Sequence, residues 1–443
     1  MTSTEQIKSK LSNSISVKLV VIFLLILLMQ IPLSFVRGLI DERQQMQHQA
    51  QRDISNRWGG SQYIGSPLLN IYSVNRNILN SHDKATNSNL TRNHSIQATK
   101  FDLDVNLNVE KRYLGIYEAA IFTSQVEIKG IIDIPSELAI LEGGEIKLFI
   151  PIKQIKGLKK LHSIKINNKS VNFSLQQTRM NNLNGFELDL TGFIKQKSLI
   201  FELEFLLVGS QQFDVLPLAK ESNIKIQSNW NAPSFVGDYL PDERSLSETG
   251  FKAHWTINNI IQNIGKNNNT VQTYSNNFIG NQTLPTIGVK VIIPANIYQV
   301  NERTVKYSFL IVLLTFAGFF LAELFFKLRL HPFQYLLIGV SLTVFYLLLL
   351  SISEYLLFNW AFMIASGSII LLISSYCAVV LQQRSRGVYT GLLFTILYGF
   401  IFVLVKAEET SLLMGSIGIW LMLALVMHLT RKIDWYAVNN ESR

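Results

Sequence analysis

Six apolar segments, each close to the length needed to cross a lipid bilayer, constrain this chain more than any other feature. A hydrocarbon core of ~30 Å needs about 20 apolar residues, because a helix rises ~1.5 Å per residue. Lipid offers the backbone no hydrogen-bond partner, so such segments must be helical. The sequence therefore predicts a membrane protein with six transmembrane α-helices, one N-terminal and five C-terminal. These cover residues 17–36, 307–326, 335–353, 360–381, 389–405 and 412–429.

The first segment could be a cleaved signal peptide or an uncleaved anchor. Its apolar run, from Val17 to Val36, exceeds the ~7–15 residues usual in a signal peptide, and no Ala-x-Ala-like cleavage site follows it. We therefore expect an uncleaved transmembrane helix. The polar, Gln-rich residues 40–57 predict a helical stalk that continues from it.

Charges beside the segments predict their orientation, because short loops rich in Lys and Arg stay in the cytoplasm. We expect cytoplasmic termini at 1–16 and 430–443, a large domain at 37–306 on the outer side of the membrane, and a five-helix bundle at 307–429. The opposite, outer loops hold Glu354 in one case and Lys406, Glu408 and Glu409 in the other. The inner connections hold Lys8, Lys10, Lys18, Lys327, Arg329, Arg384, Arg386, Arg431 and Lys432.

Residues 37–306 carry the alternating apolar and polar pattern of half-buried strands, punctuated by Asn, Gly and Pro. This pattern predicts a large β-rich domain, an antiparallel sandwich or barrel-like fold. Its Asn-rich stretches at 75–95 and 263–282 are expected to be surface loops. The only cysteine, Cys377, lies in an apolar segment, so this domain folds without disulfides. The clearest strands are expected at 101–109, 163–166, 199–207, 224–226 and 288–293.

The formal charge of +9 does not indicate a nucleic-acid-binding protein. No run of five or more Lys and Arg occurs, and no zinc, helix-turn-helix or RNP-like pattern is present. The familiar catalytic and nucleotide-binding fingerprints are missing as well. We therefore expect the lipid bilayer as a partner, with an unidentified envelope protein or glycan as a possible second one. We expect neither a cofactor, a metal site nor a catalytic residue.

The densest motif of the polar region lies between residues 230 and 255. Its aromatic rings, prolines and glycines indicate either a loop packed on the sheet or a binding cleft. Asp238, Asp242, Glu243 and His254 suggest acid–base or metal chemistry, but no second His stands at ligand spacing. The candidate contact residues are Trp230, Pro233, Phe235, Gly237, Asp238, Pro241, Gly250, Phe251, His254 and Trp255.

Four further candidates lie in or beside the apolar segments. Glu323 sits near an inner end, where Lys327 one turn later indicates an interfacial ion pair or, alternatively, a proton-linked site. His331 and Pro332 are typical of a helix start, with Pro in the first turn. Glu354 is expected to cap the outer end of the third span and to reach water.

Several of these motifs resemble the CreD family of bacterial inner-membrane proteins. The resemblance implies a multi-pass inner-membrane protein with a role in cell-envelope integrity, associated in some bacteria with a two-component response and with β-lactam or colicin stress. It implies no reaction, substrate or catalytic residue. The segments that carry it are 114–117, 230–241, 250–255, 298–337, 345–354 and 431–436.

Three functions follow as hypotheses. The first is a non-enzymatic protein that supports envelope integrity or the envelope-stress response through its periplasmic domain. The second is a transporter or lipid-handling protein that uses the C-terminal bundle, with Glu323 as a proton-linked group. The third is an envelope enzyme facing the periplasm, with Asp238 and His254 as candidates.

Overall fold

The chain of this computed structural model forms two compact units. The helical unit comprises residues 1–46 and 295–443, and the β unit comprises residues 47–294. The sequence had placed these boundaries at 36/37 and 306/307. The structure describes residues 15–74, 91–135, 145–171, 176–180, 183–193, 196–258, 284–293, 297–325, 330–380, 383–407 and 410–431.

Some expectations fall outside these described residues. They include the cytoplasmic tail after Arg431 and most of both Asn-rich stretches. Residues 91–95 are described, and they belong to a strand rather than to the expected loop. Of the charged residues that predict the orientation, those outside the described residues are Lys8, Lys10, Lys327, Arg329, Glu408, Glu409 and Lys432.

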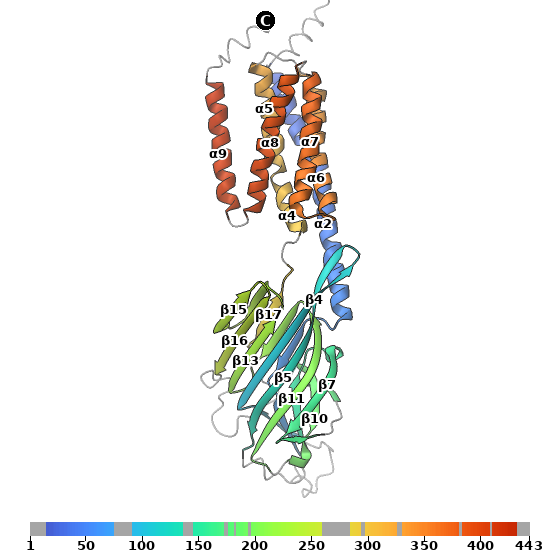
Figure 1. The fold of residues 1–443 in the computed structure, drawn as a ribbon, viewed down its shortest axis with the longest axis vertical. Coiled ribbons are helices and arrows are strands. Elements are labelled where there is room, and N and C mark those ends of the chain that lie inside the picture. Colours follow the sequence, from blue (N-terminus) through green and yellow to red (C-terminus); the bar gives the residue numbers. More distant parts are fainter. Residues whose placement is uncertain are drawn as a thin grey trace, which may run out of the picture. The chain divides into compact units, whose positions relative to one another are not determined.

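Helices occupy all six apolar stretches (Figure 1). Four of them, α2, α6, α7 and α8, are long and apolar enough to cross a membrane. The pair α4 and α5, bent by 41°, would make a fifth span. The helices are α2 (Ile15–Arg57), α4 (Ile297–Lys306), α5 (Ser308–Phe325), α6 (Pro332–Ser353), α7 (Phe358–Val380), α8 (Arg384–Lys406) and α9 (Ser411–Thr430).

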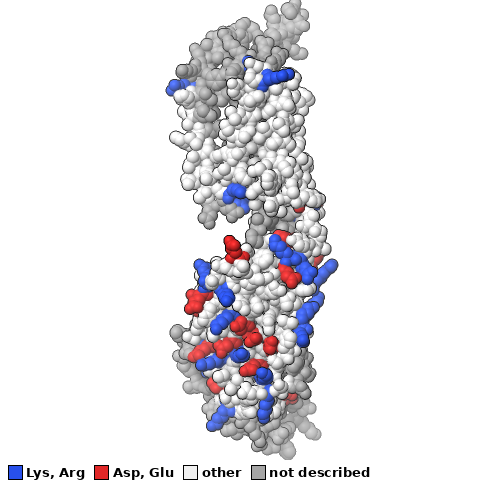
Figure 2. All heavy atoms as spheres, in the orientation of Figure 1, with Lys and Arg blue, Asp and Glu red and all other residues white. Residues whose placement is uncertain are grey.

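The surface of the helical unit is that of a membrane protein. Figure 2 shows its visible described face almost free of charge between the ends, whereas both signs are interspersed over the β unit. Large exposed apolar patches are uncommon on soluble proteins, and here they match the lipid-facing side of spanning helices. On α2 the exposed apolar side chains include Val20, Phe23, Leu24, Leu27, Leu28, Ile31 and Phe35.

One helix agrees with the expected division of the chain and one differs from it. The predicted stalk is confirmed, because α2 continues without a break from Ile15 to Arg57. Helix α4 lies in the stretch expected to be β-rich. It is amphipathic, and it packs with the helical unit by burying Tyr298, Asn301 and Val305. A helix with one apolar face needs such a partner surface.

The described residues of the β unit form three sheets. The largest has eight strands in the order β15-β16-β13-β4-β5-β11-β7-β8. Its strands are β4 (Lys100–Leu114), β5 (Tyr117–Asp133), β7 (Leu158–Ile166), β8 (Lys169–Ser170), β11 (Ser198–Ser210), β13 (Glu221–Ser228), β15 (Glu243–Ser247) and β16 (Gly250–Asn258).

The other two sheets have five and four strands, in the orders β3-β2-β6-β10-β9 and β1-β12-β17-β14. The five-stranded sheet contains β2 (Leu68–Val74), β3 (Thr91–Gln97), β6 (Glu145–Pro151), β9 (Gln176–Met180) and β10 (Leu183–Asp189). The four-stranded sheet contains β1 (Gln62–Gly65), β12 (Gln212–Leu216), β14 (Pro233–Gly237) and β17 (Ile287–Val291). Two 3-10 turns, η2 (Ile155–Gly157) and η3 (Thr191–Phe193), connect strands.

The expectation of a purely antiparallel domain is wrong in two places. Strand β4 pairs with β13 in parallel, and β1 pairs with β12 in parallel. A parallel pair needs a crossover connection rather than a hairpin. The chain meets this need by passing through the other sheets before β13 returns beside β4.

The three sheets share one apolar core, which explains the alternation seen in the sequence. Along β4 the odd-numbered side chains from Phe101 to Val109 are buried, while the even-numbered ones between them are exposed. The five-stranded sheet adds Leu69 and Ile71 to the same core, and the four-stranded sheet adds Phe213 and Val289.

Candidate functional site

The aromatic residues of the 230–255 motif build the core rather than a cleft. Phe235 makes edge-to-face contacts with Phe251 and Trp255, at ring-centroid distances of 5.8 and 5.9 Å. The Trp255 side chain is only 1% exposed, and its Nε1 donates to the Tyr239 carbonyl at 3.3 Å. Trp230 Nε1 donates to the Ile292 carbonyl at 2.9 Å. These rings therefore join β14, β16 and the end of β17.

Two carboxylates of the motif bind backbone amides. Asp238 Oδ2 accepts the Thr286 N–H at 2.7 Å, and Asp242 Oδ2 accepts the Thr256 N–H at 2.7 Å. Such hydrogen bonds fix loops onto neighbouring strands. They favour the packing interpretation of these aspartates over the acid–base one. Pro241 lies in the same loop, half-buried, between β14 and β15.

Two glycines of the motif are required by the backbone. Gly237 has φ +106°, and Gly250, at the start of β16, has φ +146°. A Cβ at Gly250 would lie 2.0 Å from the Ser228 carbonyl oxygen. Only glycine allows this close approach of two strands. Pro233, which fixes φ, is the first residue of β14.

His254 points to the other face of the large sheet. Its Nε2 lies 2.6 Å from Asn223 Oδ1, and its Nδ1 lies 3.9 Å from a carboxylate oxygen of Glu243. This histidine lines an open groove of about 440 Å³, next to a second groove of about 430 Å³. Both grooves run between β15 and the outer faces of β16, β13 and β4.

The grooves present hydroxyl, amide and charged groups of both signs. They suit a polar ligand that offers many donors and acceptors. Among the described residues, no group of three His, Cys, Asp or Glu side chains is placed to hold a metal ion. The polar lining residues are Asp104, Asn106, Lys225, Gln227, Ser228, Glu243, Arg244, Ser245, Ser247, Thr249, Lys252 and His254.

Sequence reasoning named His254 and Glu243, together with Gly250 and Phe251, but missed the other residues that line the grooves. The signal was available in part, because the period-two pattern of β4 places Asp104 and Asn106 on its outer face. The pairing of β13 with β4, which brings Lys225 opposite Asp104, was not visible. Strands distant in sequence had to be placed in register first.

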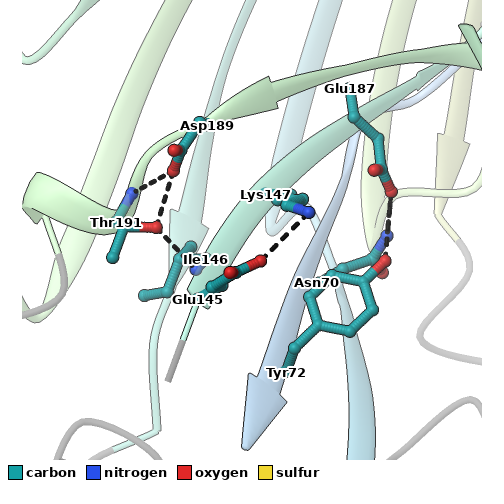
Figure 3. A network of polar contacts seen from close by, with 8 residues as sticks. All are labelled: Asn70, Tyr72, Glu145, Ile146, Lys147, Glu187, Asp189 and Thr191. Carbon is teal, nitrogen blue, oxygen red and sulfur yellow. Dashed lines mark hydrogen bonds and ion pairs between the residues drawn. The ribbon is translucent and has the colours of Figure 1, made fainter. Parts of the chain in front are cut away.

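A second polar cluster lies on the five-stranded sheet (Figure 3). Glu187 is buried, and its Oε1 accepts from the Tyr72 hydroxyl at 3.1 Å and from Asn70 Nδ2 at 3.4 Å. Burial and the nearby Glu187 carboxylate raise the pKa of Tyr72 to about 12. The Lys147 ammonium lies 5.2 Å from the Tyr72 ring centroid and pairs with Glu145 at 3.1 Å. These contacts tie β2, β6 and β10 together.

In the helical unit, Glu323 is a buried carboxylate with three donors. Lys18 Nζ lies 2.7 Å away, the Leu330 N–H 3.2 Å away, and the Tyr335 hydroxyl 3.2 Å away. The Glu323 side chain is 7% exposed. The expected partner Lys327 lies outside the described residues, and the partner seen comes from α2, 305 positions earlier in the chain.

Glu354 corrects the expectation of a water-exposed cap. It does end α6, but its side chain is only 11% exposed. Its Oε1 lies 3.5 Å from Arg43 Nε and accepts from the Tyr298 hydroxyl at 3.4 Å. Beside it, Asn301 Nδ2 donates to Ser353 Oγ at 2.8 Å. The end of α6 is therefore covered by α2 and α4, which the sequence could not place there.

The helix start at His331 and Pro332 agrees with the sequence interpretation. His331 is the N-cap of α6, and its Nδ1 accepts the Phe333 N–H at 3.2 Å. Gln334 completes the capping box by accepting the His331 N–H at 3.0 Å. Pro332 follows as the first helical residue.

Comparisons with known proteins place the chain in a family. A family model described as "Inner membrane protein CreD" matches residues 14–436. The inner membrane protein CreD of Escherichia coli K12 is 31% identical over 426 residues, which cover 95% of this chain and 93% of that protein. Neither description names a reaction.

Similarities to solved structures are weak. An M1 zinc metallopeptidase from Deinococcus radiodurans aligns with 47% of this chain and 52% of its own, at 6% identity and a TM-score of 0.19. Native yeast LTA4 hydrolase aligns with 44% of this chain and 30% of its own, at 9% identity and a TM-score of 0.21. These scores support no argument about fold or activity. The full-length match to its relative is what decides, and the chain belongs to the CreD family of inner membrane proteins.

Proposed function

We propose that this protein supports the integrity of the cell envelope as a six-span inner membrane protein, with its β unit in the periplasm and both termini in the cytoplasm. The β unit acts by binding an envelope component, not by catalysis. The family supports the membrane location, and the positive short loops support the orientation.

This proposal is carried by two ion pairs that join α2 to the C-terminal helices. Lys18 pairs with Glu323, and Arg43 pairs with Glu354. The two basic residues stand 25 positions apart on one helix, or ~37 Å at ~1.5 Å per residue. This length exceeds a hydrocarbon core of ~30 Å by a few ångströms at each end. The two pairs are thus spaced to lie at the two membrane surfaces.

A binding role for the β unit, rather than a catalytic one, is supported by the hydrogen bonds of its two candidate aspartates. Asp238 and Asp242 are engaged by backbone N–H groups, whereas the grooves beside His254 are open and polar. A transport role is supported less well, because Lys18 already neutralises Glu323 near one end of the bundle. A proton-carrying carboxylate would be expected along a central pathway.

The test of the envelope role is complementation of a deletion strain. We expect the deletion to increase sensitivity to detergent, osmotic shock and envelope-targeting antibiotics, and the intact gene to restore resistance. The variant Lys225→Ala/Lys252→Ala, which removes two groove lysines, should restore it poorly. The control Lys160→Ala/Lys165→Ala removes two lysines of β7 on the same sheet and should restore it fully. Unchanged sensitivity of the deletion strain would contradict the proposal.

Orientation and catalysis need separate tests. A periplasm-dependent reporter inserted after residue 150 should be active, and the same reporter at the C-terminus should be inactive. The reverse pattern would refute the orientation alone. Full complementation by Asp238→Asn, at normal protein levels, is expected for a binding protein, because Asp238 does not line the grooves. Loss of function with this variant at normal levels would favour the envelope enzyme.

A further inference from the structure

The β4–β5 hairpin continues beyond the sheet that it belongs to. Strand β13 pairs with β4 only as far as Leu107, and β11 pairs with β5 only as far as Ile121. Beyond these points the described strands β4 and β5 pair with each other alone, up to Leu114 and Tyr117. A two-stranded ribbon buries little apolar surface by itself. We call its end, residues 110–118, the hairpin tip.

The turn of the hairpin tip displays apolar side chains. Tyr113 is 65% exposed, and Leu114 and Ile116 are each 42% exposed. Gly115 makes the turn with φ +63°. Isolated apolar side chains are common on protein surfaces, whereas here three stand together at the end of one hairpin.

Charged residues stand directly behind this turn. Lys111 pairs with Glu118 at 3.0 Å, and Arg112 pairs with Glu110 at 3.4 Å. The Arg112 guanidinium also lies 5.6 Å from the Trp58 ring centroid. The end of the hairpin is therefore apolar and aromatic, and the charged side chains behind it are paired with one another. Amphipathic Tyr side chains and long basic side chains with apolar stems are suited to the bilayer interface.

The hairpin tip lies at the end of the β unit where the chain enters it. Trp58 Nε1 donates to the Phe122 carbonyl at 3.4 Å, and Gln51 Nε2 donates to the Glu118 carbonyl at 3.2 Å. From Phe122 to Glu118 the strand β5 thus follows α2 from Trp58 back to Gln51. The turn of the hairpin therefore lies toward Gln47, the first residue of the unit. Figure 1 shows the hairpin beside this part of α2.

The chain also leaves the β unit near the base of the hairpin. The Val109 N–H donates to Asn229 Oδ1 at 2.8 Å. The next residue, Trp230, donates to the carbonyl of Ile292, two residues before the unit ends at Pro294. Both connections to the helical unit thus leave from the end of the β unit that carries the hairpin tip.

We propose that the hairpin tip inserts into the surface of the lipid bilayer that holds the apolar helices. The two connections keep the tip close to that membrane, so a small apolar patch suffices for lasting contact. The proposal goes beyond the envelope role and does not depend on which face of the membrane carries the β unit.

The test uses the full chain in lipid nanodiscs with a Cys377→Ala background. An environment-sensitive fluorophore is attached at Leu114→Cys. The control is Ile200→Cys, an exposed apolar position (46%) paired with Ile131 on β5. Its partner Ile131 lies 14 residues along β5 from Tyr117, or ~46 Å at ~3.3 Å per residue. Lipids with brominated or spin-labelled acyl chains should quench the label at 114 several-fold more than the label at 200.

Two further outcomes decide the proposal. Equal quenching at both positions would overturn it. Protection of position 114 from aqueous iodide without lipid quenching would also overturn it, since the tip would then rest on protein. Adding Tyr113→Ser and Ile116→Ser should lower the equilibrium constant for insertion about a hundredfold, because each of the two buried apolar side chains is worth roughly a factor of ten. The signal at position 200 should stay unchanged, which shows that the β unit remains folded.

Discussion

At the scale of single residues, buried ionisable groups in this protein are held by specific donors. Glu323 receives an ammonium, a backbone N–H and a hydroxyl. A charge in an apolar helix is costly unless it is paired, and these three donors provide the pairing. The same logic applies to Glu187 in the β unit, where Asn70 and Tyr72 provide the donors.

Replacing Glu323 with Gln should destabilise the protein by about 1 to 3 kcal/mol, because Lys18 loses its counter-charge in a partly buried site. The measurement is thermal or denaturant unfolding in detergent. Adding Lys18→Met should recover part of the loss. The control is Glu302→Gln in the exposed Lys306–Glu302 pair, which should cost ~0.5 kcal/mol or less. Equal effects of the two substitutions would contradict a buried pair.

Gly250→Ala should destabilise the β unit by about 2 kcal/mol or more, because it combines a strained φ with a clash against the Ser228 carbonyl. Unfolding of the full chain, followed by tryptophan fluorescence, measures the change. The matched control is Gly192→Ala, where an added Cβ meets no atom within 4 Å and φ is not positive. A Gly250→Ala protein as stable as the control would show that β13 and β16 can separate freely.

Stability should fall in acid partly through Asp189. Hydrogen bonds from the Thr191 side chain and backbone hold its pKa below the ordinary value. A lowered folded pKa means that the stabilisation is complete above the unfolded pKa of ~3.9 and is lost as pH falls through the folded value. Asp189→Asn should therefore flatten the pH dependence of unfolding below about pH 4. Thr191→Val should flatten it partly. An unchanged profile would refute the assignment.

At the scale of elements, local sequence decides where each helix and strand begins. The capping box of His331 and Gln334, with Pro332 between them, starts α6. The alternation from Phe101 to Val109 forms β4 with one buried face. These signals act over a few residues, so they need no knowledge of the rest of the chain.

His331→Ala should destabilise α6 by about 1 kcal/mol, because the Phe333 N–H loses its acceptor. His331→Asn keeps a capping oxygen and should be close to the wild type. Helix loss by circular dichroism and the thermal midpoint both report the effect. If Asn and Ala behave alike, the cap contributes nothing and the helix start depends on Pro332 or on packing.

At the scale of the whole molecule, contacts between distant segments assemble the helical unit. Residues from the first helix pair with residues about 300 positions later, as in Lys18–Glu323 and Arg43–Glu354. The N-terminal helix is thereby part of the bundle, in addition to its role as an anchor. Both pairs are between helices, so each fixes how α2 is positioned along its neighbours.

Exchanging the charges of one pair tests this assembly. Arg43→Glu alone places two carboxylates together and should lower the thermal midpoint of the helical unit. The combined variant Arg43→Glu/Glu354→Arg should recover much of it. Resistance of α2 to proteolysis in nanodiscs gives a second readout. Failure of the combined variant to improve on the single one would argue that Arg43 and Glu354 do not interact.

Most of the helices and strands could be predicted from the sequence, whereas α4 and the strand at 91–97 could not. Apolar length predicted the helices, period two predicted strands such as β4 and β11, and flanking motifs predicted the start of α6. The sequence also showed that residues 230–255 are rich in aromatic residues, prolines and glycines. Helices and strands depend on backbone hydrogen bonding and on the burial of one face. Residues close together in the sequence are enough to set both.

The partners of those residues depend on tertiary contacts. The tertiary structure placed the aromatic rings of the 230–255 motif in the core, turned Asp238 and Asp242 toward backbone amides, and joined β4 to β13 in parallel. It also gave Glu323 and Glu354 partners from the first helix. A side chain's partner depends on the register between segments far apart in the chain, and that register is fixed only when the whole core packs.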